Sequence, residues 1–515
     1  MPELKKIYGP PGTGKTTTLL DILQKELVAG TPLTKIAFVT HTVAARDEAR
    51  ERVYKIIPVH NNDTFRYFRT IHGICFNAVG LSKYQVMQVP DYLAFGDRIG
   101  MPFSVNFTES MDDDGLPLGY NNSGGNEILA IRQFAAAWMQ DWKDFPDQWP
   151  DWCDTDTLKE VMDEYKAYKV ENTKFDFVDM LQLYMEKPKA LDIDVLIVDE
   201  AQDLSRLQWE VVHNFMGACK RVYIAGDDDQ SIYGFIGADP TGFLHHPCDN
   251  EMVLPKTYRL RANIWQFANQ IISEVKERRA KQIEVRGTGG EIEYWNSPIE
   301  YLDLEADQTT MVVARHHKQL AGISDMLSEK GIAYSHRGRT LVNTKRAKAI
   351  YAWIKLQRGD NVGMNDVVRI LEVKGLTKEQ LRSVRAQARE HPEWMMDRKL
   401  MAKEFKLNFD AHWVNELARA PHDVKKNDLI DIIIHQRGLD AIVTQPKIDL
   451  TTYHACKGRE ADHVVLFTDC YNSAFRNAET NPDEERRLAY VGVTRAREKL
   501  TIVAPETDMY MRSLL

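Results

Sequence analysis

The chain has 515 residues, 43% hydrophobic and 27% charged, which excludes a single hydrophobic core and predicts a globular protein of two to four domains. Its 66 basic and 75 acidic residues give a net charge of −9, which excludes a uniformly basic surface but allows a local basic groove. It has no apolar run of 18 residues, so we expect no transmembrane helix and no membrane partner.

The first feature along the chain is a phosphate-binding loop. Residues 9–16 fit the pattern G-x-x-x-x-G-K-[ST] and follow a short apolar strand candidate, Ile7-Tyr8. In such a loop backbone N–H groups face a polyphosphate, Lys15 reaches the β and γ phosphates, and the Thr16 hydroxyl ligates Mg²⁺. Residues 17–23 are predicted to form the helix whose N-terminus faces the phosphates. The predicted nucleotide-binding residues are Gly9, Pro10, Pro11, Gly12, Thr13, Gly14, Lys15, Thr16 and Thr17.

Short apolar runs then alternate with helical stretches. One set lies at residues 36–39, 195–198 and 222–225, and a second at 311–314, 464–467 and 500–503, with a glycine-rich stretch at 286–290 between the sets. Short strands separated by helices indicate parallel sheets covered on both faces. We therefore predict an α/β fold with two parallel-sheet domains.

Two regions interrupt this alternation. Residues 90–175 contain glycine- and aspartate-rich loop signals and then a tryptophan-rich helical stretch, and residues 345–445 are helical and highly charged. We interpret both as insertions. The predicted domains are a first α/β domain at 1–89 and 176–254, its helical insertion at 90–175, a second α/β domain at 255–344 and 446–515, and a reduced helical insertion at 345–445.

An acidic pair follows the strand candidate at residues 195–198. Asp199 can hold Mg²⁺, largely through water, and Glu200 can accept a proton from a water that attacks the γ phosphate. The alternative is an acidic helix N-terminus without catalytic function.

A second polar cluster follows the strand candidate at residues 222–225. Ligands of open α/β sheets bind outside the carboxyl ends of the strands, so Gln230 could sense the γ phosphate or position the water. The three consecutive aspartates at residues 227–229 on their own predict a solvated turn.

These motifs resemble, in order, those of the UvrD/Rep-type superfamily 1 helicases. The resemblance runs from residue 9 to about residue 500 and is carried by residues 9–16, 199–203, 226–233, 258–259, 451–460 and 491–496. It implies two RecA-like parallel-sheet domains, the first with the phosphate loop, and mainly helical insertions in each.

The resemblance implies a first-domain half of an ATP site. Lys15, Thr16, Asp199, Glu200 and Gln230 would form it, with Thr16 and Asp199 on Mg²⁺. ATP and Mg²⁺ are thus the expected cofactors.

Further residues would complete that site. Tyr258 would stack on the adenine, and Glu460 would contact the ribose or couple the domains. Arg259 and Arg495 would reach the γ phosphate from the second domain as arginine fingers, which stabilise the charge that develops in phosphoryl transfer.

The resemblance also implies contacts with nucleic acid. Residues 39–42 and 70–73 match segments that contact the phosphate backbone without sequence preference, and Phe235 stands where the family usually has a stacking tryptophan. Taken singly, the histidines among these residues are more typical of satisfied structural side chains. The expected contact residues are Thr40, His41, Thr42, Thr70, His72, Phe235, Tyr453 and His454.

The resemblance implies an ATP-dependent motor on single-stranded DNA and at single-strand/duplex junctions, and the family branch implies 3′→5′ movement. It would unwind duplex DNA or displace bound proteins. The alternative is a nucleotide-switched DNA- or partner-binding module with little turnover.

We expect a monomer in the cytoplasm, or in the host cytoplasm if a phage encodes the chain. A protein that loads it onto DNA is left open. Six scattered cysteines without a C-x-x-C pair suit a reducing compartment and argue against a zinc site.

Overall fold

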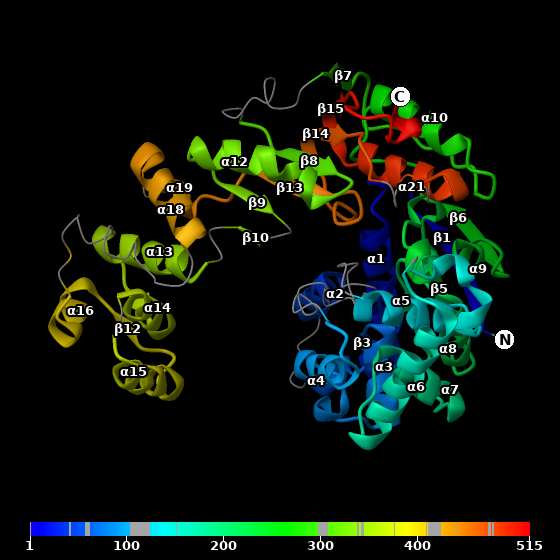
Figure 1. Cartoon of the computed structure of the whole chain (residues 1–515), viewed down its shortest axis with the longest axis horizontal. Helices are drawn as coiled ribbons and strands as arrows, with labels where there is room; N and C mark the ends of the chain where they lie inside the picture. Colours follow the sequence, from blue (N-terminus) through cyan, green and yellow to red (C-terminus); the bar gives the residue numbers. More distant parts are fainter. Residues whose placement is uncertain are drawn as a thin grey trace. The chain divides into compact units, whose positions relative to one another are not determined.

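The chain forms two compact units, which are described separately (Figure 1). Unit 1 comprises Met1–Ala262, Asn269–Thr288 and Arg486–Tyr490, and unit 2 comprises Asn263–Ala268, Gly289–Glu485 and Val491–Leu515. The computed structural model describes residues 2–40, 43–56, 62–103, 124–150, 152–296, 307–336, 339–340, 344–374, 376–407, 409, 424–438, 440–471, 475 and 478–515.

Unit 1 is built on a six-stranded sheet in which every neighbouring pair is parallel. The strand order is β3-β2-β4-β5-β1-β6. The strands are β1 (Glu3–Tyr8), β2 (Ile36–Val39), β3 (Phe68–Arg69), β4 (Val195–Val198), β5 (Arg221–Gly226) and β6 (Asn250–Val253).

Both faces of this sheet are apolar and covered. Along β4, Val195 and Ile197 join one buried cluster while Leu196 and Val198 join another, as the alternation of side chains along a strand requires. The covering helices are α1 (Lys15–Val28), α2 (Val43–Ile56), α3 (Ile71–Val79), α7 (Phe177–Glu186), α8 (Arg206–Met216) and α9 (Pro240–Leu244).

A separate helical core occupies the region between β3 and α7. It contains α4 (Val89–Ile99), α5 (Gly124–Ala137) and α6 (Thr155–Glu171). Phe95 and Tyr165 pack there with ring centroids 5.1 Å apart. This region therefore has its own apolar centre, distinct from the two clusters of the sheet.

Unit 2 contains a seven-stranded sheet that is parallel except at one edge, where β9 and β10 pair antiparallel. The order is β10-β9-β13-β8-β14-β15-β7. The strands are β7 (Glu291–Trp295), β8 (Thr310–Ala314), β9 (Tyr334–His336), β10 (Arg339–Thr340), β13 (Ile448–Thr452), β14 (Ala461–Phe467) and β15 (Ala496–Val503). The prediction of two parallel-sheet α/β domains is confirmed.

The region between β10 and β13 is helical, with a short hairpin of β11 (Val362–Gly363) and β12 (Met395–Met396). Figure 1 shows α13, α14 and α15 beside one another. Their core centres on Trp353, whose ring stacks on Phe409 at 3.9 Å. The helices are α13 (Lys345–Arg358), α14 (Met364–Lys374), α15 (Lys378–Glu390), α16 (Arg398–Phe405), α18 (Val424–Arg437) and α19 (Asp440–Val443).

Three other α-helices lie among the described residues. Unit 2 contains α12 (Ala321–Glu329), while α10 (Ala262–Ser273) and α21 (Pro482–Val493) contribute residues to both units. Within the described ranges we find no helix long and apolar enough to cross a membrane.

Candidate nucleotide site and its polar network

The phosphate loop joins the end of β1 to the start of α1. Gly12 and Gly14 have φ values of 71° and 78°, a left-handed conformation that favours glycine. Gly14 is the N-cap of α1, which begins at Lys15. The Thr13 hydroxyl donates to the Pro10 carbonyl at 2.7 Å and closes the turn. The loop thus presents the N-terminus of a helix, where backbone N–H groups can bind an anion.

Lys15 lies between two carboxylates that follow β4. Its Nζ is 3.0 Å from Asp199 Oδ1 and 2.5 Å from Glu200 Oε1. The Thr16 hydroxyl donates to Asp199 Oδ2 at 3.3 Å. The sequence separates these residues by more than 180 positions. The parallel strands β1 and β4, which lie on either side of β5, bring them to one edge of the sheet. A carboxylate and a hydroxyl this close fit Mg²⁺, which takes few protein ligands and completes its shell with water and phosphate oxygens.

Burial and charge act in opposite directions here. Burial alone would lower the pKa of Lys15, but Asp199 and Glu200 outweigh it and raise that pKa, so Lys15 stays charged. For Asp199, burial and the neighbouring Glu200 raise the pKa against the opposing effect of Lys15. A cation that binds at Asp199 would favour its ionised form.

The backbone of Glu200 is strained. This residue has φ 55° and ψ 39°, and its N–H donates to Asp199 Oδ1 at 2.9 Å. A non-glycine residue in this conformation costs on the order of 1 kcal/mol. The Glu200 side chain is 31% exposed, whereas that of Asp199 is 2% exposed. Of the pair, Glu200 is therefore the carboxylate that water can reach.

Gln202 connects this pair to the strand end of β5. Its Nε2 donates to Glu200 Oε2 at 2.6 Å, and its Oε1 accepts from the Asp227 N–H at 2.9 Å. Asp227 Oδ2 in turn accepts from Gln230 Nε2 at 2.6 Å. Sequence reasoning assigned no role to Gln202. Its one signal in the sequence was its position within the acidic motif, two residues after Glu200.

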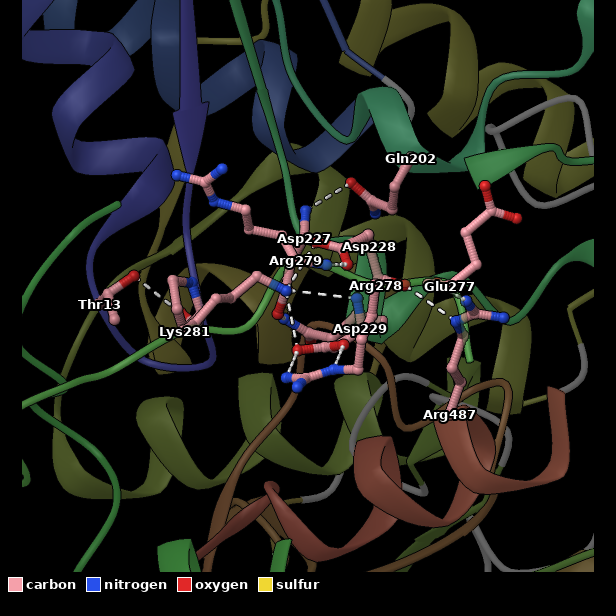
Figure 2. Close-up of polar contacts among 12 residues, drawn as sticks. Thr13, Gln202, Asp227, Asp228, Asp229, Glu277, Arg278, Arg279, Lys281 and Arg487 are labelled. Carbon is pink, nitrogen blue, oxygen red and sulfur yellow. Dashed lines mark hydrogen bonds and ion pairs between the residues drawn. The ribbon is translucent and has the colours of Figure 1, made fainter. Parts of the chain in front are cut away.

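The aspartates at 227–229 were predicted to form a solvated turn, and this prediction is wrong. All three are fully buried, because they contact the ammonium of Lys281, as Figure 2 shows. The sequence prediction overlooked Lys281, which lies more than 50 residues away.

Residues 257–259 pack on the phosphate loop within unit 1. The Tyr258 N–H donates to the Gly12 carbonyl at 2.8 Å, and the Thr257 hydroxyl donates to the Pro11 carbonyl at 2.7 Å. A Cβ on Gly12 would lie 2.4 Å from Arg259 Cβ, so only glycine fits this approach. The Tyr258 side chain is 67% exposed beside the loop. Residues 257–259 thus belong to unit 1.

Arg495 and Glu460 lie in unit 2. Arg495 is 2% exposed; its Nε donates to the Val491 carbonyl at 2.9 Å, and its Nη2 donates to the Thr494 hydroxyl at 3.1 Å. Glu460 pairs with Arg497. These contacts orient both side chains within their own unit.

Three expected nucleic-acid contacts lie near β2 and α3. Thr70 is the N-cap of α3, where its hydroxyl accepts from the Gly73 N–H at 3.2 Å. The His72 ring packs edge-on against Phe177 at 5.4 Å, and Thr40 is 2% exposed. His41 and Thr42 lie outside the described residues.

The other three expected contacts differ in exposure. Phe235 is half-buried, 6.3 Å from the Tyr233 ring. His454 Nδ1 accepts from Arg315 Nη1 at 3.3 Å. Tyr453 is fully buried and its hydroxyl donates to the Phe467 carbonyl, so in this structure its ring is a core side chain. These geometries favour Phe235 and His454 over Tyr453 as surface contacts.

Comparison with protein families bears on this arrangement. Residues 4–250 match the UvrD/REP helicase N-terminal domain, and residues 376–507 match the UvrD-like helicase C-terminal domain. The chain belongs to the UvrD/Rep family of superfamily 1 helicases. The two RecA-like domains expected for such a helicase correspond to the two parallel sheets.

Individual relatives are distant in sequence. The chain is 25% identical to the ATP-dependent DNA helicase PcrA of Leuconostoc citreum, over 58% of this chain and 40% of the relative. It is 26% identical to UvrD2 of Mycobacterium tuberculosis, over 68% and 54%, and 22% identical to PcrA of Bacillus subtilis, over 98% and 80%. The matches with the first two relatives thus span about half of those proteins.

Proposed function

We propose that this chain is an ATP-dependent DNA helicase that moves 3′→5′ on single-stranded DNA. The movement would unwind duplex DNA or displace bound proteins. Relatives named ATP-dependent DNA helicase support the proposal. The observation that carries it is the convergence of Lys15, Thr16, Asp199 and Glu200 at one sheet edge beside a helix N-terminus.

In the proposed hydrolysis, the loop amides and Lys15 bind the β and γ phosphates. Thr16 and Asp199 would hold Mg²⁺, which neutralises phosphate charge when bound. Glu200 accepts the proton of the attacking water as the new P–O bond forms, and the bond from the γ phosphorus to the bridging oxygen breaks. Gln230 orients that water. Gln202, which contacts both Glu200 and Asp227, keeps Glu200 in place relative to Gln230.

The remaining residues complete the proposed site. Tyr258 stacks on the adenine, and its exposed ring beside the loop supports this role. Arg259 and Arg495 stabilise the charge that develops on the γ phosphate, and Glu460 contacts the ribose or couples the domains. The domain boundaries predicted from the sequence remain part of the same proposal.

The proposed DNA contacts are backbone contacts and stacking, which require no particular base sequence. Thr70 and His72 would contact phosphates, and Phe235 would stack on a base. His454 would act from unit 2. The protein is proposed to work as a cytoplasmic monomer, with a loading protein as an additional partner.

The test is ATP hydrolysis with and without single-stranded DNA, followed by unwinding of duplexes that carry either a 3′ or a 5′ single-stranded tail. The proposal predicts strong stimulation by DNA and unwinding from the 3′ tail. Unwinding from the 5′ tail alone would contradict the polarity. Weak hydrolysis that DNA leaves unchanged would contradict the motor and favour a nucleotide-switched binding module.

A further inference from the structure

Unit 1 contains a buried cluster of charged side chains that is connected to the candidate nucleotide site. The Nζ of Lys281, which is fully buried, is 2.8 Å from Asp227 Oδ1, 2.6 Å from Asp228 Oδ1 and 2.8 Å from Asp229 Oδ2. Figure 2 shows the lysine reaching these three carboxylates from the segment that follows α10. One ammonium therefore holds three consecutive residues of the turn after β5.

The three aspartates differ in their other partners. Asp229 also accepts two hydrogen bonds from Arg278, from Nε and Nη2, each at 2.7 Å. Asp228 Oδ2 accepts from the Arg279 N–H at 2.8 Å. Both carboxylates thus keep a second donor outside the turn. The second oxygen of Asp227, Oδ2, instead accepts a hydrogen bond from Gln230 Nε2 at 2.6 Å.

Asp227 is the branch point of the network. Its side chain receives Lys281 on one oxygen and Gln230 on the other. Its backbone N–H donates to Gln202, which donates to Glu200. A shift of Asp227 would therefore move both the residue proposed to orient the water and the amide that holds the proposed general base.

We propose that Lys281 is a positioning residue for ATP hydrolysis, which acts by holding Asp227 and thereby Gln230 and Glu200. The inference rests on the proposed ATPase function. Lys281 has no access to substrate, since it is fully buried behind the aspartates. Small displacements of groups around a reacting centre reduce rates by up to about 100-fold, so an indirect contact of this kind can have a large effect on kcat.

The test is a double-mutant cycle between Lys281→Arg and Gln230→Ala, with kcat and KM for ATP measured under DNA stimulation. Arginine keeps the charge but cannot place one nitrogen against all three carboxylates. We expect kcat to fall about tenfold with KM within about twofold. In the double variant kcat should fall by less than the product of the two single effects, because both changes disturb the arrangement that Asp227 holds.

Arg278→Lys is the matched control, since it perturbs the same cluster at Asp229 and leaves the contact of Lys281 with Asp227. Its kcat should stay within about twofold of the parent. The proposal is overturned if the effects of Lys281→Arg and Gln230→Ala on kcat multiply in the double variant. It is also overturned if Arg278→Lys lowers kcat as much as Lys281→Arg.

Thermal unfolding of each variant accompanies the kinetics. If Lys281→Arg does not fold, Asp227→Asn replaces it in the cycle, because Lys281 acts through Asp227 in this proposal. A double variant whose kcat falls by less than the product of the two single effects then supports the proposal. Effects on kcat that multiply overturn it. A parent protein without ATP hydrolysis would overturn the proposed function and this inference together, whereas hydrolysis with multiplicative effects would overturn this inference alone.

Discussion

Two lysines of unit 1, Lys15 and Lys281, lie among carboxylates that follow the adjacent strands β4 and β5, yet the exposure of the two groups differs. Lys15 is 10% exposed and contacts Glu200, which is 31% exposed. Lys281 and its three aspartates are all 0% exposed. Both lysines have a raised pKa, because in each case the adjacent carboxylates outweigh the effect of burial. Both groups are therefore charged in the folded protein.

The comparison indicates that access, and not charge, separates a reactive group from a supporting one. A phosphate or a water can reach Glu200 and the phosphate loop, so the contacts of Lys15 can be exchanged for contacts with a ligand. The contacts of Lys281 cannot be exchanged without opening the core. We expect substitutions at Lys281 to affect stability most and substitutions at Lys15 to affect chemistry most.

The largest effect on stability is expected for Lys281→Met. It leaves three carboxylates in a buried site with Arg278 as a remaining cation, and breaking a buried ion pair costs about 3–5 kcal/mol. Denaturant unfolding should show a loss of that size in the free energy of unfolding. A loss below about 1 kcal/mol would show that the cluster opens to water.

Lys15→Ala should have the opposite profile. Removing one preorganised donor that stabilises the charge of a transition state typically costs about 100- to 1000-fold in rate, and we expect a loss of this size for Lys15. Steady-state ATPase assays should show this fall in kcat. Its loss of unfolding free energy should be smaller than that of Lys281→Met, because Glu200 is open to solvent. Equal losses of stability in the two variants would remove the distinction.

His463 in unit 2 is a buried titratable side chain whose surroundings, unlike those of Lys15 and Lys281, favour the neutral form. Burial lowers its pKa to about 4, helped by Lys499 and opposed by Glu293. Its ordinary pKa is about 6.5. The unfolded chain therefore binds the proton first as pH falls, and stability present above pH 6.5 is lost between about pH 6.5 and 4.

This loss should amount to about 3 kcal/mol, from a pKa difference of about 2.5 units. Denaturant unfolding measured across this pH range tests it, with His463→Gln as the control that should lose this part of the pH dependence. An unchanged slope in the control would assign the pH dependence to other groups.

The smallest effect is expected at a surface pair. Lys220 Nζ is 2.9 Å from Asp194, and its side chain is 68% exposed. Exposed ion pairs contribute about 0–1 kcal/mol because water and salt screen them. Lys220→Ala should leave the free energy of unfolding within about 1 kcal/mol, as measured by the same denaturation. A larger loss would mean that exposure does not rank these ion pairs.

The sequence predicted those parts of the fold that local patterns encode. The strands at 36–39 and 195–198 and the helix after the phosphate loop follow from apolar runs and from glycine spacing, and the structure contains β2, β4 and α1 there. The edge strands β3 and β10 were not predicted, because two residues carry no periodic signal. The burial of residues 227–229 depends on a lysine distant in sequence, which no local pattern reveals.

The candidate site was predictable to a similar extent. Motif order placed Lys15, Asp199 and Glu200 in one site, and the structure brings them into contact. The packing of Arg259 against Gly12 was not predicted, since it depends on how the chain leaves β6. The burial of Tyr453 is a tertiary property that its motif does not encode.

In the proposed mechanism Glu200 accepts the proton in a hydrolytic site and does not merely pair with Lys15. The most direct measurement compares ATP binding and DNA-stimulated hydrolysis in the parent protein and in Glu200→Gln, which keeps size and hydrogen bonding but removes the base. General-base catalysis contributes about 100- to 10,000-fold. We predict a fall in kcat within that range, with ATP bound at least as tightly as by the parent. Hydrolysis that remains within about threefold of the parent would contradict it.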